Sequence, residues 1–222
     1  MGKEREIKLR IGDLQALRRA LRRLGARVVR PRLHERNVLF DTAERSLASR
    51  EQLLRIRTEL PVGRGQKTGP RSLVTFKRPL CTADSGHKGE RHKVLDEIEL
   101  EISDAKALVM MFEGLGMQSW FQYEKFRTTF RLPASNAWAK GLLIELDETP
   151  IGVFLELEGP ANAIDRAAKA LGFKTSDYVL ANYTVLYREY CRGQGEEPRD
   201  MLFSESVNKK RGARSKKRKL SS

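Results

Sequence analysis

Charged residues stand at every second position in several short stretches of this chain, with apolar residues between them. Seven stretches follow the pattern: Glu4–Lys8, Arg55–Arg57, Thr75–Lys77, Glu97–Glu101, Lys125–Arg127, Glu145–Asp147 and Glu156–Glu158. Positions i and i+2 of a β-strand share a face, so each stretch would carry one ionic face and one apolar face. The pattern therefore predicts a set of β-strands.

An ordinary antiparallel sheet with one face in water would also alternate in this way, and for a single stretch that is the simpler interpretation. A solvated face, however, can use Ser, Thr, Gln or Asn, whereas these positions are nearly all Glu, Asp, Lys or Arg. Like charges side by side cost energy unless a ligand or a metal compensates them. We therefore expect an α+β protein in which the strands close into a barrel, with a polar charged lumen and an apolar outside covered by helices.

Helical periodicity marks four further segments, which would supply that cover. They are a helix capped by Asp13 and running to about Leu24, a helix capped by Ser103 and running through Leu115, and the segments Ala161–Leu171 and Ser176–Cys191. Four arginines of the first helix fall opposite its leucines. They fit a solvated helix face better than a nucleic-acid contact.

The charge balance of the 222 residues is +14, which favours polyanionic partners such as phosphorylated small molecules, nucleic acid or an anionic membrane surface. No apolar run approaches the ~20 residues that span a bilayer, and the N-terminus lacks a signal-peptide core. We therefore expect a cytoplasmic protein without a membrane span. Residues 193–222 form a basic tail that is predicted to be disordered and could contact nucleic acid weakly, or direct a eukaryotic protein to the nucleus.

The charged faces suggest a particular chemistry. Cations could hold the oxygens of a triphosphate, and the expected residues are Arg55, Arg57, Lys77, Lys125 and Arg127. Carboxylates repel phosphate unless a hard cation stands between them, and Glu4, Glu6, Glu156 and Glu158 are in this position. Mg²⁺ or Mn²⁺ fits such a site. Asp147 would complete the metal shell or orient the attacking oxygen.

The order of these elements resembles a known family. Glu4-x-Glu6-x-Lys8 is similar to the ExExK signature that opens the CYTH domain of the triphosphate tunnel metalloenzyme superfamily. That superfamily includes class IV adenylate cyclases, thiamine triphosphatases and inorganic triphosphatases. The later strands follow in the same order, and the match spans residues 3 to about 190.

The resemblance implies an eight-stranded antiparallel tunnel with helices outside, formed by residues 1–192. It implies metal ligands at Glu4, Glu6, Glu156 and Glu158 with Asp147 close by, and phosphate binding by Lys8, Arg55, Arg57, Lys77, Lys125 and Arg127. Lys8, Arg57 and Asp147 are the residues expected to act in catalysis. A homodimer is a further expectation.

The reaction itself stays open at this stage. A cyclase directs the ribose 3′-oxygen at the α-phosphorus, whereas a triphosphatase directs water at the terminal phosphorus, and both need the same cations and carboxylates. The class IV adenylate cyclase-like reaction, from ATP to cyclic AMP and pyrophosphate, is favoured by analogy of layout. The alternative to an enzyme is a non-catalytic module that binds polyphosphate or RNA. Such a module would gain nothing from four carboxylates beside the phosphates.

One energetic expectation follows from the cations alone. A lumen of uncompensated positive charge repels itself, so Arg55, Arg57 and Arg127 are expected to serve the phosphates and to add little to the stability of the fold.

Overall fold

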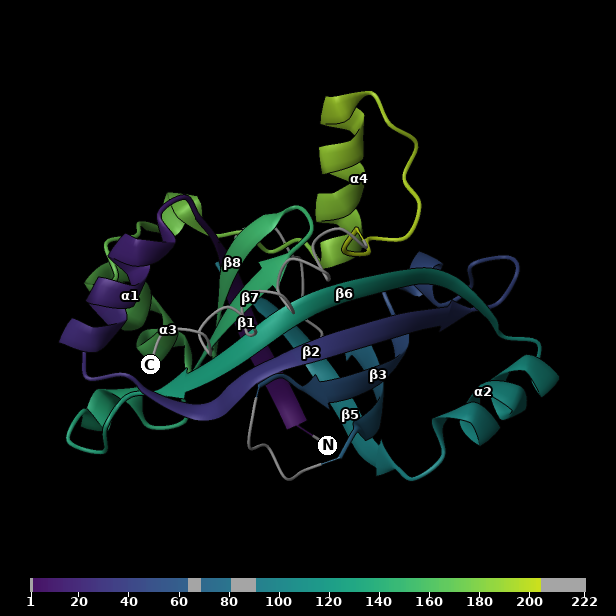
Figure 1. The fold of residues 1–222 in the computed structure, drawn as a ribbon, viewed down its shortest axis with the longest axis horizontal. Coiled ribbons are helices and arrows are strands. Elements are labelled where there is room, and N and C mark those ends of the chain that lie inside the picture. Colours follow the sequence, from purple (N-terminus) through teal and green to yellow (C-terminus); the bar gives the residue numbers. More distant parts are fainter. Residues whose placement is uncertain (1, 64–68, 81–90, 205–222) are drawn as a thin grey trace, which may run out of the picture.

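A computed structural model of the protein describes residues 2–63, 69–80 and 91–204. In this part of the chain, antiparallel strands close into a barrel in the order β1-β5-β4-β3-β2-β6-β7-β8, which confirms the predicted architecture. The strands are β1 (Gly2–Ile11), β2 (Arg27–Asp41), β3 (Leu53–Pro61), β4 (Arg71–Pro79), β5 (Lys93–Ile102), β6 (Gln118–Arg131), β7 (Leu143–Thr149) and β8 (Gly152–Glu158). The long strands β2 and β6 lie side by side across the middle of the molecule (Figure 1).

The helices are α1 (Leu14–Arg23), α2 (Ala105–Gly114), α3 (Ala161–Ala170) and α4 (Tyr183–Gln194). The start of α1 is as predicted: Asp13 accepts hydrogen bonds from the amides of Gln15 and Ala16, which otherwise lack partners in the first turn. The cap of α2 is Asp104 and not Ser103, because the Asp104 carboxylate accepts from the amide of Ala107.

The predicted start of the last helix at Ser176 is wrong. Thr175–Asp177 forms a single 3₁₀ turn, and Val179 exchanges two backbone hydrogen bonds of 2.9 Å with Lys8 of β1. These bonds hold the chain extended until Asn182, whose side chain caps α4 by accepting from the amide of Val185. A contact with a distant strand thus overrides the local helical pattern.

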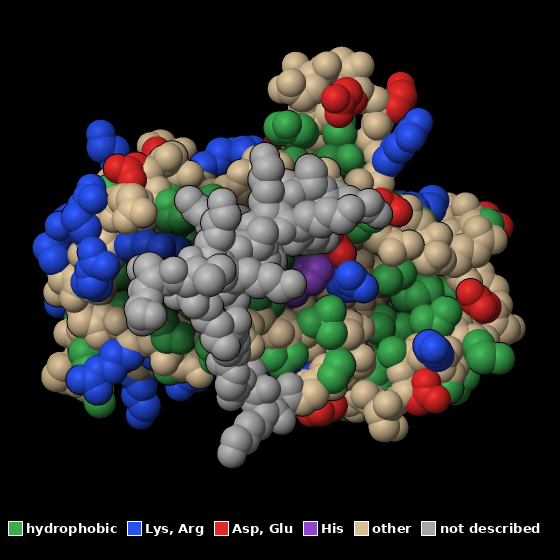
Figure 2. Space-filling model, in the orientation of Figure 1, with side chains coloured by type: hydrophobic (Ala, Val, Ile, Leu, Met, Phe, Trp, Pro, Cys, Tyr) green, Lys and Arg blue, Asp and Glu red, His purple; other side chains and the backbone are tan. Residues whose placement is uncertain are grey.

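Helices α1 and α3 cover the outer face of β1, β7 and β8 at one end of the barrel (Figure 1). Ile7 and Leu155 are fully buried there against Leu17 and Leu21 of α1 and Ile164 of α3. Burial of this apolar surface, at about 25 cal/mol per Å², stabilises the barrel from outside and leaves the inner face to polar residues. Lys and Arg side chains gather over α1 (Figure 2), and the exposure of Arg18, Arg19, Arg22 and Arg23 agrees with the predicted solvated face.

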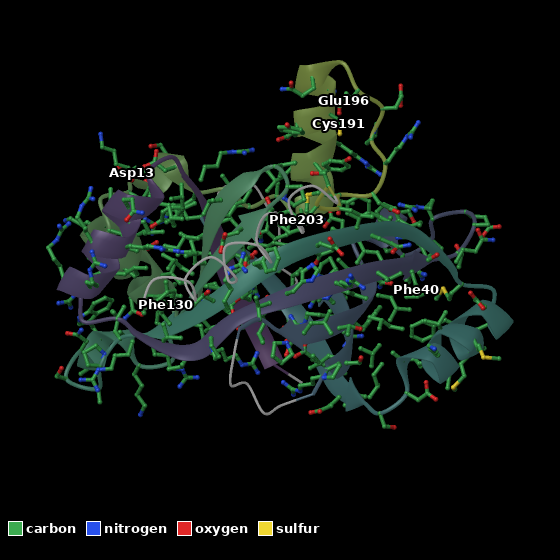
Figure 3. The ribbon with its side chains drawn as sticks, viewed as in Figure 1. Asp13, Phe40, Phe130, Cys191, Glu196 and Phe203 are labelled. Atoms are coloured by element: carbon green, nitrogen blue, oxygen red, sulfur yellow. The ribbon has the colours of Figure 1, made fainter. Side chains whose placement is uncertain are left out.

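At the other end of the barrel, α2 contributes little to the core. None of its residues is buried, although Phe112 makes an edge contact with Phe40 of β2 at 5.2 Å between ring centroids. Figure 3 shows Phe40 at this end, far from Asp13. No helix in the described part of the chain is long and apolar enough to cross a membrane.

The chain after α4 returns to the barrel. Met201 is fully buried; its amide donates to the carbonyl of Gln122, and its carbonyl accepts from the amide of Glu124. Phe203 packs on Phe126 of β6 at 5.0 Å (Figure 3). Residues 193–204 thus have defined contacts, and the predicted disorder does not hold for them because their apolar side chains find a place on β6. The two basic clusters of the tail, 209–211 and 216–219, lie outside the described residues.

Candidate active site

The polar faces of the strands turn into the barrel and enclose a dense set of charges. Most of the residues predicted for the site are buried in this lumen: Glu4, Glu6, Lys8, Arg55, Arg57, Lys125, Asp147 and Glu156. Lys77 and Arg127 keep 14% and 11% of their side chains exposed, and Glu158 is half-buried. Buried charges are costly unless they are paired, so their partners decide what each can do.

One part of the lumen holds a dense set of ion pairs. We call it the Arg127 cluster; its members are Glu35, Lys125, Arg127, Glu145, Asp147 and Glu156. The guanidinium of Arg127 donates to both oxygens of Asp147 at 2.7 and 2.6 Å and also contacts Glu145 and Glu156. Lys125 Nζ donates to Asp147 at 2.8 Å and lies 3.5 Å from Glu35.

These contacts set the charge states in the cluster. Burial alone would raise the pKa of the Glu156 carboxyl, but Arg127, Lys125 and Lys8 hold it well below its usual range. Against the same burial, Lys125 and Arg127 lower the pKa of Glu35 to about 2. Glu145 differs: burial is the largest effect and raises its pKa, and Glu156 and Asp147 add to the rise. The cluster is a network of ions that stabilise one another.

Tyr183 extends this network from outside the barrel. It is the first residue of α4, it is buried, and its hydroxyl donates to Asp147 at 2.7 Å. Its ring lies 5.5 Å from Lys8 Nζ and 5.1 Å from Lys125 Nζ, within the range of cation–π attraction. Burial and the nearby Asp147 raise the pKa of Tyr183 well above its usual value, so it remains a donor.

The second part of the lumen, the β3 arginine pair, consists of Arg55 and Arg57. Arg55 donates to two neutral hydroxyls, those of Tyr123 and Thr75, both at 3.2 Å, and its nearest carboxylate is Glu99 at 3.9 Å. Arg57 donates to Glu99 at 2.8 Å. The Nε atom of Arg55 is buried without a hydrogen-bond partner, whereas that of Arg57 forms an ion pair with Glu59 at 3.3 Å. A buried donor without an acceptor favours an anionic ligand.

A third part is rich in carboxylates. Glu4 accepts from Lys77 at 2.7 Å, and Glu6 accepts from Lys8 at 2.9 Å. Glu158 stands opposite Glu6 in the β1–β8 register, and its carboxylate has no hydrogen bond or ion pair with any described residue. Burial, with Glu145 and Glu4 nearby, raises the pKa of Glu158 to about 8. Like charges directly opposite each other on neighbouring strands are unfavourable without a counter-ion.

The donor chemistry at Glu158 fits a hard divalent cation. Carboxylate oxygens are the ligands of Mg²⁺ and Mn²⁺, and a cation here would compensate Glu158, Glu6 and Glu4 together. Across the described residues, no three or more His, Cys, Asp or Glu side chains are arranged as a ready metal site. Glu4, Glu6, Glu156 and Asp147 each form an ion pair with a lysine or arginine.

The premise of the sequence-based expectation about stability, a lumen of uncompensated positive charge, does not hold at Arg127. That arginine is surrounded by Asp147, Glu145 and Glu156, so the positive charge of the lumen is compensated at this point. Charges on β7 and β8 that are remote in the sequence supply this compensation.

Sequence reasoning also missed residues of the site. Glu35, Asn37, Tyr123 and Tyr183 line it or contact its charges. On β2 the alternation is hidden, because His34 and Arg36 on the outer face are as polar as Glu35 and Asn37 on the inner face. The position of Glu35 opposite Lys125 emerges only from the β2–β6 register. Tyr183 lies with Tyr187 and Tyr190 at helical spacing in the sequence, a pattern that is typical of ordinary core packing.

The chain is similar to proteins of one known family. The family model described as "CYTH domain" matches residues 2–177. A protein of Methanocaldococcus jannaschii named "Putative adenylate cyclase" is 26% identical over 169 residues, which cover 76% of this chain and 83% of that protein.

Solved structures share the fold. A conserved hypothetical protein of Pyrococcus furiosus is 26% identical with a TM-score of 0.62, covering 82% of this chain and 99% of its own. A structure from Vibrio parahaemolyticus, described as a putative adenylate cyclase, is 19% identical with a TM-score of 0.63, covering 82% and 96%. A Hippeastrum protein, described as a putative adenylyl cyclase with a dominant triphosphatase activity, is 19% identical with a TM-score of 0.53, covering 88% and 97%.

Proposed function

This chain belongs to the CYTH family, and on that basis we propose that it is a divalent-metal-dependent enzyme acting on a triphosphate bound in the barrel lumen. The observation that carries the proposal is that two groups of one lumen lack partners of opposite charge in close contact. Arg55 has a buried Nε without an acceptor and donates to neutral hydroxyls, and Glu158 has no ion pair with a lysine or arginine among the described residues. A triphosphate with a divalent cation supplies both missing partners at once.

Each residue then has a role. Arg55, Arg57 and Lys77 bind phosphate oxygens, and Lys8 of β1 and Lys125 of β6 add positive charge to the same lumen. Lys8 sits between Glu6 and Glu156, where these carboxylates raise the pKa of its ammonium despite burial, so it stays protonated. A fixed cation at this point would stabilise charge that develops on the reacting phosphate.

Asp147 acts through its neighbours. It accepts from Arg127, Lys125 and Tyr183, and so fixes three donors around one part of the lumen. Glu158, Glu6 and Glu4 would hold the metal, with Glu156 nearby. When bound, Mg²⁺ or Mn²⁺ would neutralise charge on the phosphate oxygens.

For the reaction we favour the class IV adenylate cyclase-like one, in which the ribose 3′-oxygen attacks the α-phosphorus of ATP and pyrophosphate leaves. The name of the Methanocaldococcus jannaschii relative supports this choice. Hydrolysis of the terminal phosphate is the second candidate, because the Hippeastrum protein of the same fold is described as a dominant triphosphatase.

The test is a panel of triphosphates, namely ATP, GTP, thiamine triphosphate and inorganic tripolyphosphate, with Mg²⁺ or Mn²⁺. The products to be resolved are cyclic nucleotide, diphosphate, pyrophosphate and orthophosphate. We expect turnover with the metal and none in EDTA. Full activity in EDTA would refute the metal requirement, and tight binding without any product would favour the non-catalytic module.

Glu158→Gln tests the metal site directly. The metal concentration for half-maximal activity should rise by tenfold or more, since a ligand is lost from a site with few ligands. The fold should remain intact, because the carboxylate has no partner among the described residues. Glu101→Gln, at a side chain of β5 that is 62% exposed, is the matched control. It should change neither the metal concentration for half-maximal activity nor the stability of the fold. An unchanged metal requirement in Glu158→Gln would remove Glu158 from the site.

A further inference from the structure

The chain after α4 supplies contacts at an edge of β6 that β7 leaves open. Strand β7 pairs with β6 from Phe126 to Phe130, and in the described part of the chain no β7 residue stands beside the preceding half of β6. Residues 200–203, which we call the C-terminal clasp, run back from α4 to this edge (Figure 1). The CYTH family model ends at residue 177, so the clasp lies outside the matched domain.

The backbone of the clasp is bonded to β6 on both sides of Tyr123. The Met201 amide donates to the carbonyl of Gln122 at 2.9 Å, and the Met201 carbonyl accepts from the amide of Glu124 at 3.0 Å. The other edge of β6 pairs with β2 at the same residues. Because backbone groups without partners cost free energy, bonds on both edges fix the path of β6 at Tyr123.

Side chains attach the clasp to both α4 and β6. The Asp200 carboxylate accepts from the amide of Gln122 at 2.8 Å, and the Asp200 carbonyl accepts from the hydroxyl of Tyr187 in α4 at 3.2 Å. The Phe203 amide donates to the Glu124 carboxylate at 3.3 Å. The clasp therefore holds the helix and the strand in one arrangement.

The Met201 side chain packs where two tyrosines of the site meet. It is fully buried in an apolar cluster that includes Tyr123 of β6 and Tyr183 of α4. The two tyrosine rings lie 5.9 Å apart between centroids. A shorter side chain in place of Met201 would leave a cavity into which these rings could shift.

Tyr123 connects the clasp to the β3 arginine pair. Its hydroxyl accepts from Arg55 at 3.2 Å, whereas the nearest carboxylate to Arg55, that of Glu99, lies 3.9 Å away. A neutral acceptor orients the guanidinium and leaves its charge available to an anion. Binding groups must be held to within about 0.5 Å to be effective, so the position of Tyr123 affects what Arg55 can bind.

We propose that the clasp is a positioning element of the triphosphate site: Met201 holds Tyr123 in place, and the Tyr123 hydroxyl orients Arg55 toward a phosphate. This inference rests on the proposed function of the lumen, and it adds to the site a part of the chain that follows the family domain. Met201 does not touch the triphosphate itself, so its substitution changes the affinity through Tyr123.

The first measurement is the affinity for tripolyphosphate with Mg²⁺, by calorimetry, because this ligand reports on the phosphate site alone. Met201→Ala opens a cavity beside Tyr123 and should weaken binding at least about fivefold. Met201→Leu fills nearly the same volume and should stay within about twofold of wild type. Leu202→Ala, at a clasp side chain that is 46% exposed, is the matched control and should leave the affinity unchanged.

A double-mutant cycle with Tyr123→Phe separates positioning from a general loss of stability. Tyr123→Phe keeps the ring and removes the hydroxyl, so the connection from the clasp to Arg55 is cut. In that background Met201→Ala should lower the affinity by less than about twofold. A loss as large as in the wild-type background would mean that the clasp acts on the fold and not through Tyr123.

Asp200→Ala is an independent and milder variant, because it removes the acceptor of the Gln122 amide at an exposed residue. Its loss of affinity should be smaller than that of Met201→Ala and should also vanish with Tyr123→Phe, and it decides the question if Met201→Ala fails to fold. Unchanged affinity in each folded clasp variant would overturn this inference and leave the proposed function intact. Wild type that binds no tripolyphosphate would overturn the proposed function and this inference with it.

Discussion

The Arg127 cluster and the β3 arginine pair lie in the same lumen and carry the same kind of side chain, yet their surroundings are opposite. Arg127 is enclosed by Asp147, Glu145 and Glu156. Among the described residues, Arg55 donates to the neutral hydroxyls of Tyr123 and Thr75, and its nearest carboxylate, Glu99, lies 3.9 Å away. We infer that Arg127, which is surrounded by carboxylates, stabilises the barrel. Arg55, with neutral hydrogen-bond partners and a buried Nε that has no acceptor, is instead suited to bind an anion.

Cross-strand register produces this difference. Arg127 stands opposite Asp147 on β7, and Glu145 stands opposite Glu156 on β8. Arg55 instead stands between Leu39 of β2 and Thr75 of β4, neither of which carries a charge. The predicted phosphate-binding residues thus fall into a structural group, which includes Arg127, and a ligand-facing group, which includes Arg55. Three substitutions test that division.

Arg127→Ala should have the largest effect. It leaves Asp147, Glu145 and Glu156 buried without their main counter-ion, at a cost of about 3–5 kcal/mol in the free energy of unfolding. Urea unfolding measures this cost. Arg36→Ala, at an ion pair whose arginine is 59% exposed, should cost less than about 1 kcal/mol. If Arg127→Ala kept wild-type stability, the cluster would not be structural.

Arg55→Ala should separate function from stability. We expect kcat/KM to fall by about 30- to 1000-fold, corresponding to roughly 2–4 kcal/mol of lost transition-state binding. The free energy of unfolding should change by less than about 1 kcal/mol, because Glu99, which lies 3.9 Å from Arg55, keeps its closer ion pair with Arg57 at 2.8 Å. A large loss of stability with unchanged kinetics would place Arg55 in the structural group.

Tyr183→Phe should have the smallest effect of the three. It removes one buried hydrogen bond to the Asp147 carboxylate, which is worth about 1.5–3 kcal/mol at most, while ring packing stays. The free energy of unfolding and kcat should both decrease moderately, because Asp147 would hold Arg127 and Lys125 less firmly. Tyr190→Phe, at a tyrosine of the same helix that is 43% exposed, should change neither. Identical results for the two variants would mean that α4 does not support the cluster.

Local pattern alone predicted much of this molecule. The period-two alternation of charge marked β1 and β3–β8. The Asp13 cap of α1 and the helical periodicity of α1 and α3 marked the outer cover. These features depend on residues that are neighbours in the chain. The inward position of Lys8, Arg55, Asp147 and Glu156 also follows from alternation, once the apolar face is buried by helices.

Tertiary structure decided the pairing. Whether a lumen charge meets a partner depends on register between strands far apart in the sequence, as in the Lys125–Glu35 and Arg127–Glu145 pairs. The late start of α4, the insertion of Tyr183 and the docking of Met201 likewise depend on contacts with β1, β7 and β6. The alternation in the sequence determined which charged residues of β1 and β3–β8 face the lumen, but it did not reveal Glu35 on β2. The closed barrel decided which lumen charges are paired, because electrostatic compensation acts through space and not along the chain.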